Sequence, residues 1–163
     1  MSPTKTTTKT KATKEVKLPP NPFLHEILEL ASKQRSGAKK AEILQEYRND
    51  ALTSILIWNF DDSIISILPP GDVPYKENEV PVGTDHTSLR REWKHLYNFV
   101  KGGNDTLNGL RRETMFIQML EGLHPEEAEL VCLCKDKRLA EKYKITYDIV
   151  KQAYPDIQWG GRS

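Results

Sequence analysis

The sequence contains little cysteine and no pattern of metal ligands. Only Cys132 and Cys134 are present, two residues apart on a segment with a helical pattern. Residues i and i+2 of a helix point about 200° apart, so these thiols cannot share a metal ion or form a disulfide without breaking the helix. We interpret them as core or half-buried thiols in a reducing compartment. The four histidines are scattered without ligand spacing, and we therefore expect no metal site.

Long hydrophobic runs are also missing. No stretch of about 18 apolar residues occurs, which predicts that no helix spans a membrane. The longest apolar-rich stretch, residues 52–68, is interrupted by Asn59, Asp61 and Asp62. Residues 1–6 are not followed by the apolar core of a secretory signal. We therefore expect a soluble protein without a membrane partner.

The sequence lacks the motifs of the common phosphate-binding enzymes. Neither the P-loop nor the dinucleotide-binding pattern occurs, and Gly102 and Gly103 stand alone. The Lys-x-Asp-Gly motif of nucleotidyltransferases is absent as well. Asp61 and Asp62 are adjacent, and adjacent side chains on a helix diverge by about 100°, which does not suit a shared metal ion. We expect no catalytic residue, no metal, no cofactor and no enzymatic activity.

Charge is distributed unevenly along the chain. Residues 1–18 carry five lysines against Glu15, a balance of +4, so a total of +1 leaves −3 for the remainder. A basic tail without hydrophobic periodicity predicts disorder. It acts either as a solvated tail or as a basic arm that binds a polyanion. Because the rest of the chain is not basic overall, any polyanion contact there must be local.

The periodicity of the remaining chain predicts an all-α fold. We divide the chain into a disordered basic tail (1–20), a single compact bundle of about seven helices (21–157) and a loose C-terminus (158–163). Asn21 and Pro22 fit the N-cap and first residue of the first helix, Asn49 or Asp50 begins the third, and Thr146 begins the seventh. The helices are expected at about residues 23–31, 38–48, 51–68, 88–101, 105–121, 125–135 and 146–154.

Two of these segments need comment. The isoleucines near the end of 51–68 leave open that this part is a strand, although its length favours a helix. The fourth helix is expected to direct one face toward the core, formed by Leu89, Trp93, Leu96, Tyr97 and Val100.

A proline-rich loop separates the third and fourth predicted helices. Its prolines exclude both helix and strand pairing over residues 69–85. Tyr75 is its only aromatic residue and is expected to fix the loop to the core. The loop is either an ordered crossover or a functional element.

Two groups of basic residues are the candidate phosphate contacts. One lies around the junction of the last two predicted helices and the other on the fourth and fifth helices. A cationic helix junction with free backbone N–H groups suits a phosphate. The alternative is that these charges only solvate helix faces and pair with nearby glutamates. The candidate DNA-binding residues are Lys135, Lys137, Arg138, Lys142 and Lys144, together with Arg90, Arg91, Lys94, Arg111 and Arg112.

The chain also resembles a known family. Residues 133–139 and 145–155 are similar to the closing motif of the N-terminal all-helical DNA-binding domain of ATP-dependent DNA ligases. Residues 23–31 and 38–52 are similar to the first helices of the T4-type phage ligase. Two features depart from that pattern. Residues 140–144 replace the usual glycine turn, and the catalytic domains of a ligase are absent.

The resemblance implies a free-standing module that binds duplex DNA through its phosphates. For the phage version it also implies contact with the sliding clamp. Residues 47–52 and 68–75 look like those of short proteins of T4-like tailed phages, which implies a protein in the cytoplasm of an infected bacterium or in the virion. Our first hypothesis is a non-catalytic DNA-binding accessory protein. The alternative is a protein-interaction or virion component that docks through the Pro-rich loop and exposed aromatic residues.

Overall fold

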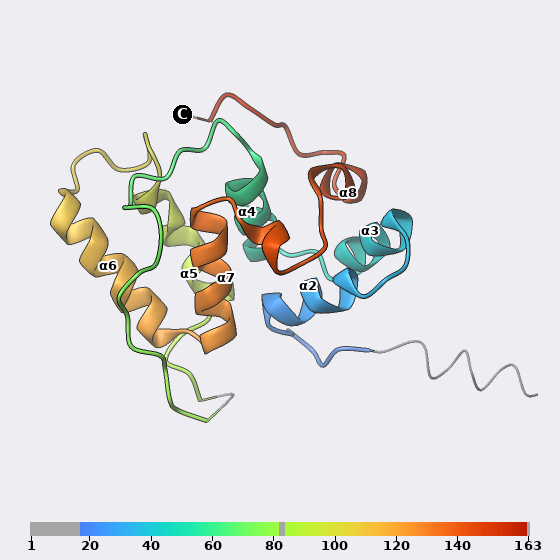
Figure 1. Cartoon of the computed structure of the whole chain (residues 1–163), viewed down its shortest axis with the longest axis horizontal. Helices are drawn as coiled ribbons and strands as arrows, with labels where there is room; N and C mark the ends of the chain where they lie inside the picture. Colours follow the sequence, from blue (N-terminus) through green and yellow to red (C-terminus); the bar gives the residue numbers. More distant parts are fainter. Residues whose placement is uncertain (1–16, 82–83, 163) are drawn as a thin grey trace, which may run out of the picture.

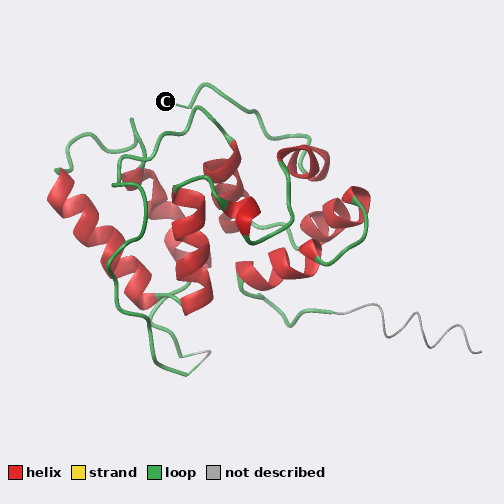
Figure 2. Ribbon diagram, in the orientation of Figure 1, coloured by secondary structure: helices red, strands yellow, loops and turns green. Residues whose placement is uncertain are grey.

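The fold is all-α. The computed structural model describes residues 17–81 and 84–162. These residues form seven α-helices and two 3₁₀ helices: α2 (Leu24–Ser32), α3 (Gly37–Glu46), α4 (Asp50–Phe60), α5 (Leu89–Glu92), η1 (Trp93–Phe99), α6 (Gly109–Gly122), α7 (Pro125–Lys135), η2 (Leu139–Glu141) and α8 (Tyr147–Ala153). Within the described ranges there is no strand, only one antiparallel bridge between Ser66 and Val100 (Figure 2). None of these helices is both long and apolar enough to cross a lipid bilayer.

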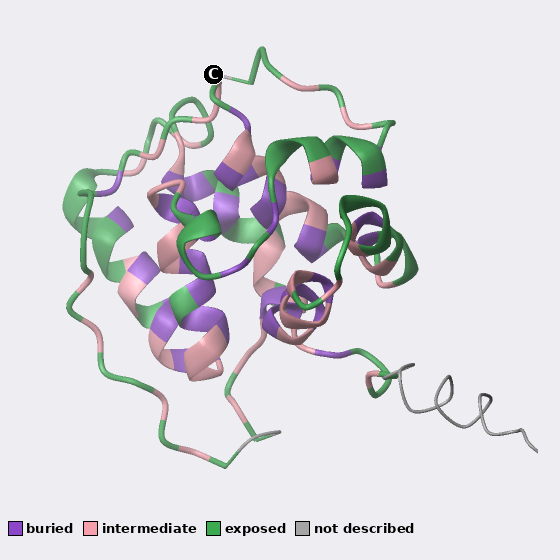
Figure 3. Cartoon of the chain, turned by 45° about the vertical axis from the view of Figure 1, so that its right-hand side comes forward, coloured by how far each residue is buried: buried purple, intermediate pink, exposed green. Residues whose placement is uncertain are grey.

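Helices α4 and α7 pack against each other in the middle of the molecule (Figure 1). On one side α3 packs on both α2 and α8, and on the other side α6 and the α5–η1 segment complete the bundle. Figure 3 shows that buried residues lie mainly on the inward faces of these helices. The core contains Leu52, Ile55, Phe116 and Val131, which are at most 1% exposed. The residues that carry the helical periodicity therefore do form one core.

Side-chain caps explain where several helices begin. The side chains of Ser36, Asn49, Asn108 and Thr146 each accept a hydrogen bond from the backbone N–H three residues later. The predicted starts at Asn49 and Thr146 are confirmed. The predicted cap at Asn21 is wrong, because α2 begins after Phe23, whose N–H donates to the side chain of Glu26 at 2.9 Å.

The third predicted helix is too long. Helix α4 ends at Phe60 and Asp61 is already extended, with φ −90° and ψ 111°. The Asp61 carboxylate accepts hydrogen bonds from the N–H and hydroxyl of Ser63, and such local bonding competes with helix continuation. Residues 61–68 are irregular, and Ile67 N–H donates to Phe99 O while Lys101 N–H donates to Ile65 O. The alternative of a strand is not borne out either, because this segment forms a single isolated bridge, between Ser66 and Val100.

The fourth predicted helix changes geometry after one turn. Helix α5 ends at Glu92 and the chain continues as η1. A 3₁₀ helix has three residues per turn, so Trp93, Leu96 and Phe99 share one face, while Tyr97 is rotated about 120° from Trp93. Leu96 and Phe99 are buried, and Tyr97 is 51% exposed. The prediction that Tyr97 faces the core is therefore wrong.

The Pro-rich loop is fixed at several points along its length. The ammonium of Lys135 donates to Pro69 O at 3.0 Å and to Gly71 O at 3.2 Å. Further on, Lys76 N–H donates to the Glu121 carboxylate at 2.9 Å. Tyr75 is half-buried against the core, and burial raises the pKa of its hydroxyl to about 12. These contacts favour the ordered-crossover interpretation of the described part of the loop.

The C-terminal residues are anchored to the bundle. Gly160 N–H and Arg162 Nε donate to the Asp61 carboxylate at 2.9 and 2.8 Å, and Trp159 packs on Tyr147. The prediction of a loose C-terminus at 158–163 is therefore wrong for residues 158–162. The predicted disorder of the N-terminal tail falls, for residues 1–16, outside the described part of the chain.

Candidate functional site

Two lysines of the predicted phosphate-binding junction make hydrogen bonds within the protein. Lys135 is 2% exposed, and its ammonium also contacts the Asp136 carboxylate at 2.7 Å. Lys137 is half-buried and donates to the carbonyls of Trp58 and Asp61 at 2.6 and 2.9 Å, which closes the C-terminal end of α4. Burial lowers the pKa of the Lys137 ammonium. The expectation that these two ammonium groups are free at the surface is therefore wrong, because backbone carbonyls already surround them.

Two further cations of the junction are paired with carboxylates. Arg138 forms a bidentate ion pair with Glu141, with both N–O distances at 2.7 Å. Lys142 contacts Glu126 at 2.9 Å and also Glu129. Burial opposes the charge on Lys142, but the hydrogen bonds to Glu129 and Glu126 outweigh it and raise its pKa. These carboxylates neutralise the positive charges of Arg138 and Lys142, which would otherwise be available to bind a phosphate.

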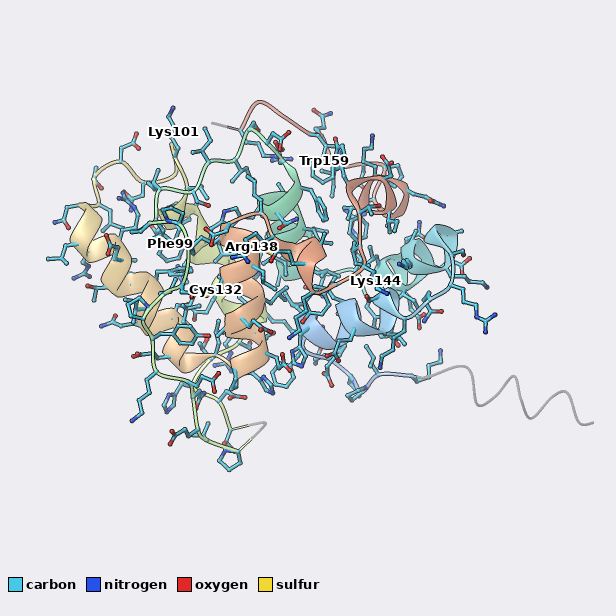
Figure 4. The ribbon with its side chains drawn as sticks, viewed as in Figure 1. Phe99, Lys101, Cys132, Arg138, Lys144 and Trp159 are labelled. Atoms are coloured by element: carbon cyan, nitrogen blue, oxygen red, sulfur yellow. The ribbon has the colours of Figure 1, made fainter. Side chains whose placement is uncertain are left out.

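Lys144 differs from the other four residues of the junction. Its side chain is exposed, and no carboxylate of the described residues lies within ion-pair distance of it (Figure 4). Its N–H donates to Ser32 Oγ at 2.8 Å, and its carbonyl accepts from Lys40 Nζ at 2.7 Å. Lys144 therefore joins the α2–α3 turn. We call the resulting surface the basic patch; it consists of Lys33, Arg35, Lys39, Lys40 and Lys144.

The basic patch is only weakly compensated by acidic residues. Lys39 is 3.9 Å from Glu42, and both side chains are more than 60% exposed, so this pair contributes little. Sequence reasoning missed four of the five residues. The only sequence signal was a group of basic residues on both sides of the break at Ser36, and their union with Lys144 depends on tertiary contacts.

The second predicted group of cations is divided between structural and exposed positions. Arg112 is buried and donates to the carbonyls of Asn98, Asn104 and Leu107. Arg90 donates to Pro22 O at 3.0 and 3.1 Å. These two guanidinium groups position loops, so they are already engaged. The exposed members are Arg91, Lys94 and Arg111.

Lys94 lies on another surface, where it adjoins several apolar side chains. A groove of about 310 Å³ lies between α4 and η1, and its floor includes Ile57, Trp58, Ile64, Trp93 and Val100. Tyr97 and Lys94 stand at its side, and Arg162 also lines it. We call this feature the Tyr97 groove.

Exposed apolar side chains adjoin the Tyr97 groove. Ile65 and Ile67 are 44% and 37% exposed, because Ser66 between them points inward, where its hydroxyl bonds Trp58 Nε1 and Lys135 O. In the described residues five large apolar side chains are exposed: Ile65, Ile67, Tyr97, Leu110 and Tyr147. Of these five, Tyr97 lines the groove, and Ile65 directly follows the lining residue Ile64 in the chain.

An aromatic hollow lies on the other side of the C-terminal segment. Its volume is about 790 Å³, and Phe60, Tyr147, Trp159 and Lys137 are among the residues that line it. The rings of Tyr147 and Trp159 meet edge to face at 5.0 Å, and Lys151 lies 4.5 Å from the Tyr147 ring. Much of the ring surface is therefore already in contact within the protein.

No reactive or metal-binding cluster accompanies these surfaces. Within residues 17–81 and 84–162 no group of three or more His, Cys, Asp or Glu side chains is placed to hold a metal ion. Burial raises the pKa of Cys132 to about 11 and that of Cys134 further, so neither thiol is activated as a thiolate. The Tyr97 groove, the basic patch and the aromatic hollow are three of the surfaces available for function in the described residues; another hollow, of about 680 Å³, includes His86, Glu92, His95 and Glu121 among its lining residues.

The fold defines an all-α protein, and a comparison with protein families assigns the chain to one of them. Residues 27–141 match the model described as a family of unknown function (DUF6433), and this match covers more than half of the chain, so the protein belongs to that family. No curated protein and no solved structure matches the chain. The similarity to ligase DNA-binding domains stays a prediction. The Tyr97 groove, apart from Arg162, lies within the matched residues.

Proposed function

We propose that the protein is a non-catalytic interaction module that binds a partner protein through the Tyr97 groove. The observation that carries this proposal is the 51% exposure of Tyr97 beside a groove lined by the half-buried Trp93 and by Trp58, which is 2% exposed. Contiguous apolar surface on a soluble domain marks interaction sites, and aromatic residues dominate the binding energy of such interfaces. The Pro-rich loop contributes less than expected, because the bundle already binds it at Gly71 and Lys76.

Site-specific photocrosslinking tests this proposal. A photoreactive amino acid replaces Tyr97 in one variant and Leu110 in another, and each full-length chain is produced in the cells where the protein acts. Leu110 is 79% exposed and lies on α6, so it controls for non-specific contact by an exposed apolar side chain. We expect one protein to be crosslinked in stoichiometric amount at position 97 and none at position 110.

Binding of the purified crosslinked partner then provides the quantitative measurement. Tyr97→Ala should weaken it by about tenfold or more, as expected for an aromatic residue at the centre of an interface, whereas Leu110→Ala should not. Equal crosslinking at both positions, or no crosslinking at either, would contradict the proposal. Recovery of the crosslinked partner from purified phage particles would identify that partner as a virion component.

DNA binding remains the second candidate function, and the basic patch favours it. Four of its five cations are exposed, the ammonium of Lys40 donates to Lys144 O, and Lys39 has one weak carboxylate contact; duplex DNA is bound chiefly through its phosphates. Lys144 is the residue that this proposal shares with the sequence prediction. Arg91, Lys94 and Arg111 are the other predicted contacts that are exposed.

Electrophoretic shift at two salt concentrations tests the DNA proposal. Lys144→Glu should weaken duplex binding several-fold at low salt and reduce the salt dependence. Lys76→Glu makes the same charge change on the Pro-rich loop, away from the basic patch, and should have less effect. Equal affinity of the wild type and the Lys144→Glu protein would exclude the basic patch as the DNA site.

A further inference from the structure

The charge around the Tyr97 groove is of one sign. Among the residues that line the groove no carboxylate occurs, whereas Lys94 and Arg162 do. Arg162 is compensated, because its Nε lies 2.8 Å from the Asp61 carboxylate. Lys94 is exposed and has no carboxylate of the described residues within ion-pair distance. The groove therefore combines an apolar floor with an uncompensated positive side.

Two more cations extend this positive side. Arg91 is three residues before Lys94 on the α5–η1 segment and is exposed. Lys101 is also exposed, and its backbone N–H donates to Ile65 O at 2.7 Å. The nearest acidic residue along the chain, Glu92, accepts a hydrogen bond from Thr87 at 2.7 Å. Of these three cations only Lys94 lines the groove; Arg91 is one turn before it and Lys101 follows the lining residue Val100, and we call the three residues the cationic rim.

We propose that the partner segment is an acidic amphipathic peptide, an inference that rests on the proposed function. Its large apolar side chains pack on Trp93 and Tyr97, and its carboxylates face Arg91 and Lys94. Electrostatic complementarity of this kind selects partners and raises association rates, while the apolar anchors supply most of the affinity. The volume of about 310 Å³ accommodates a few side chains rather than a whole domain, which also favours a short segment.

Two segments of the chain itself are unsuitable occupants. Residues 1–18 are rich in lysine and threonine, so their charge repels the cationic rim. The acidic start of α7, at Glu126 and Glu127, belongs to a helix whose apolar residues are buried in the core. A second copy of the chain therefore presents no free acidic amphipathic segment from α7.

Two designed peptides with identical leucine and phenylalanine positions test the inference. One carries glutamate and the other lysine at the polar positions, and fluorescence anisotropy measures the binding of each to the full-length protein. We expect the glutamate peptide to bind about tenfold tighter than the lysine peptide at low salt, with a smaller difference at high salt. Equal affinities, a preference for the lysine peptide, or no binding of either peptide would overturn the inference.

Matched variants separate the rim from the floor. Arg91→Glu with Lys94→Glu should reverse the preference between the two peptides, whereas Lys33→Glu with Lys76→Glu, outside the groove, should leave it unchanged. Tyr97→Ala should weaken both peptides by a similar factor. A preference that survives reversal of the rim charges would overturn the inference.

The crosslinking result distinguishes this inference from the proposed function. If a partner is crosslinked at position 97 but the glutamate and lysine peptides bind equally well, the proposed interaction function stands and the inference of an acidic partner is refuted. Sedimentation showing a dimer that Tyr97→Ala dissociates would identify a second copy as the occupant and also refute it.

Discussion

The ammonium of Lys135, at the last residue of α7, donates a hydrogen bond to the carbonyl of Pro69 at 3.0 Å. The residues are 66 positions apart in the chain, and the contact fixes the start of the Pro-rich loop to the centre of the bundle. Gly71 O and the Asp136 carboxylate accept from the same ammonium. One buried charge therefore organises a loop that has no regular structure of its own.

Replacement of Lys135 by methionine should destabilise the protein strongly. The methionine retains the length of the side chain but leaves two carbonyls and a carboxylate without their donor, which should cost about 3 kcal/mol. Urea denaturation measures the free energy of unfolding. Lys144→Met, on the exposed basic patch, is the matched control and should change it by less than about 0.5 kcal/mol. Equal effects of the two changes would contradict the structural role of Lys135.

A buried carboxylate joins the beginnings of two other helices. Glu127 is fully buried and accepts hydrogen bonds from Leu24 N–H at 3.3 Å and Leu89 N–H at 3.0 Å, which lie at the starts of α2 and α5. Burial raises the pKa of this carboxyl, although the two N–H donors oppose the rise. Glu127 therefore satisfies donors that the helices themselves cannot satisfy.

Glu127→Ala should consequently destabilise the fold by about 3 kcal/mol, because two buried N–H groups lose their acceptor. Glu127→Gln retains one acceptor oxygen and should cost less. Glu129→Ala lies on the same helix at an exposed position and should cost less than about 1 kcal/mol. Thermal unfolding of the three variants ranks them, and a Glu129→Ala effect as large as that of Glu127→Ala would contradict this assignment.

The contact between Asp61 and Arg162 predicts a dependence of stability on acid pH. Burial disfavours the Asp61 carboxylate, but hydrogen bonds from Ser63, Gly160 and Arg162 outweigh it and lower the pKa from 3.8 to about 2. A lowered pKa in the folded state means that the stabilisation is complete above about pH 4 and is lost as the pH falls toward 2. The contribution should be about 1–2 kcal/mol.

Asp61→Asn tests this contribution against a neighbouring control. The variant should be less stable than the wild type at pH 6, and this difference should shrink between pH 4 and pH 2. Asp62→Asn changes the adjacent, exposed carboxylate and should leave the pH profile unchanged. A constant difference between Asp61→Asn and the wild type over the whole range would refute the linkage.

The sequence predicted the fold better than it predicted the site. Hydrophobic periodicity and cap residues such as Asn49 and Thr146 are local signals, so the all-α class and several helix starts were predictable. The change from α5 to η1 was not, because the apolar residues fit both periods: Trp93, Leu96, Tyr97 and Val100 fit a 3.6-residue period, and Trp93, Leu96 and Phe99 fit a three-residue period. The choice between the two periods rotates Tyr97 by about 80° relative to Trp93 and so determines whether Tyr97 lies in the core or at the surface.

The charges at the predicted phosphate site illustrate the same limit. Five basic residues within ten positions look alike in the sequence. In the structure Lys135 binds carbonyls, Arg138 binds Glu141 and Lys144 remains exposed. The pair of Arg138 and Glu141 is local, but the fates of Lys135 and Lys144 depend on tertiary contacts, since Pro69 and Ser32 are far from this segment in the chain. Local charge density therefore predicted a phosphate site from basic residues that mostly make stabilising contacts within the protein.

A cluster of three rings predicts a second, milder dependence on pH. Phe23, His25 and His124 stack with centroid distances of 4.6–5.5 Å at the contact between α2 and α7. Burial lowers the pKa of His25 from 6.5, and the neighbouring His124 lowers it further, although Glu126, Glu29 and Glu26 oppose both. His25 Nδ1 is buried without a hydrogen-bond partner, so a proton there has no acceptor.

A histidine whose pKa is lowered in the folded state binds its proton more readily after unfolding. The protein should therefore lose stability as the pH falls below about 6.5, by at most about 1.4 kcal/mol per pH unit for one group. Denaturation at pH 7.5 and 5.5 measures this loss, and His25→Gln should remove it while keeping a polar side chain. His95→Gln alters an exposed histidine and should retain the loss. If His25→Gln shows the same decrease between the two pH values as the wild type, the titration belongs to another group and the ring cluster does not act as the pH-sensitive contact.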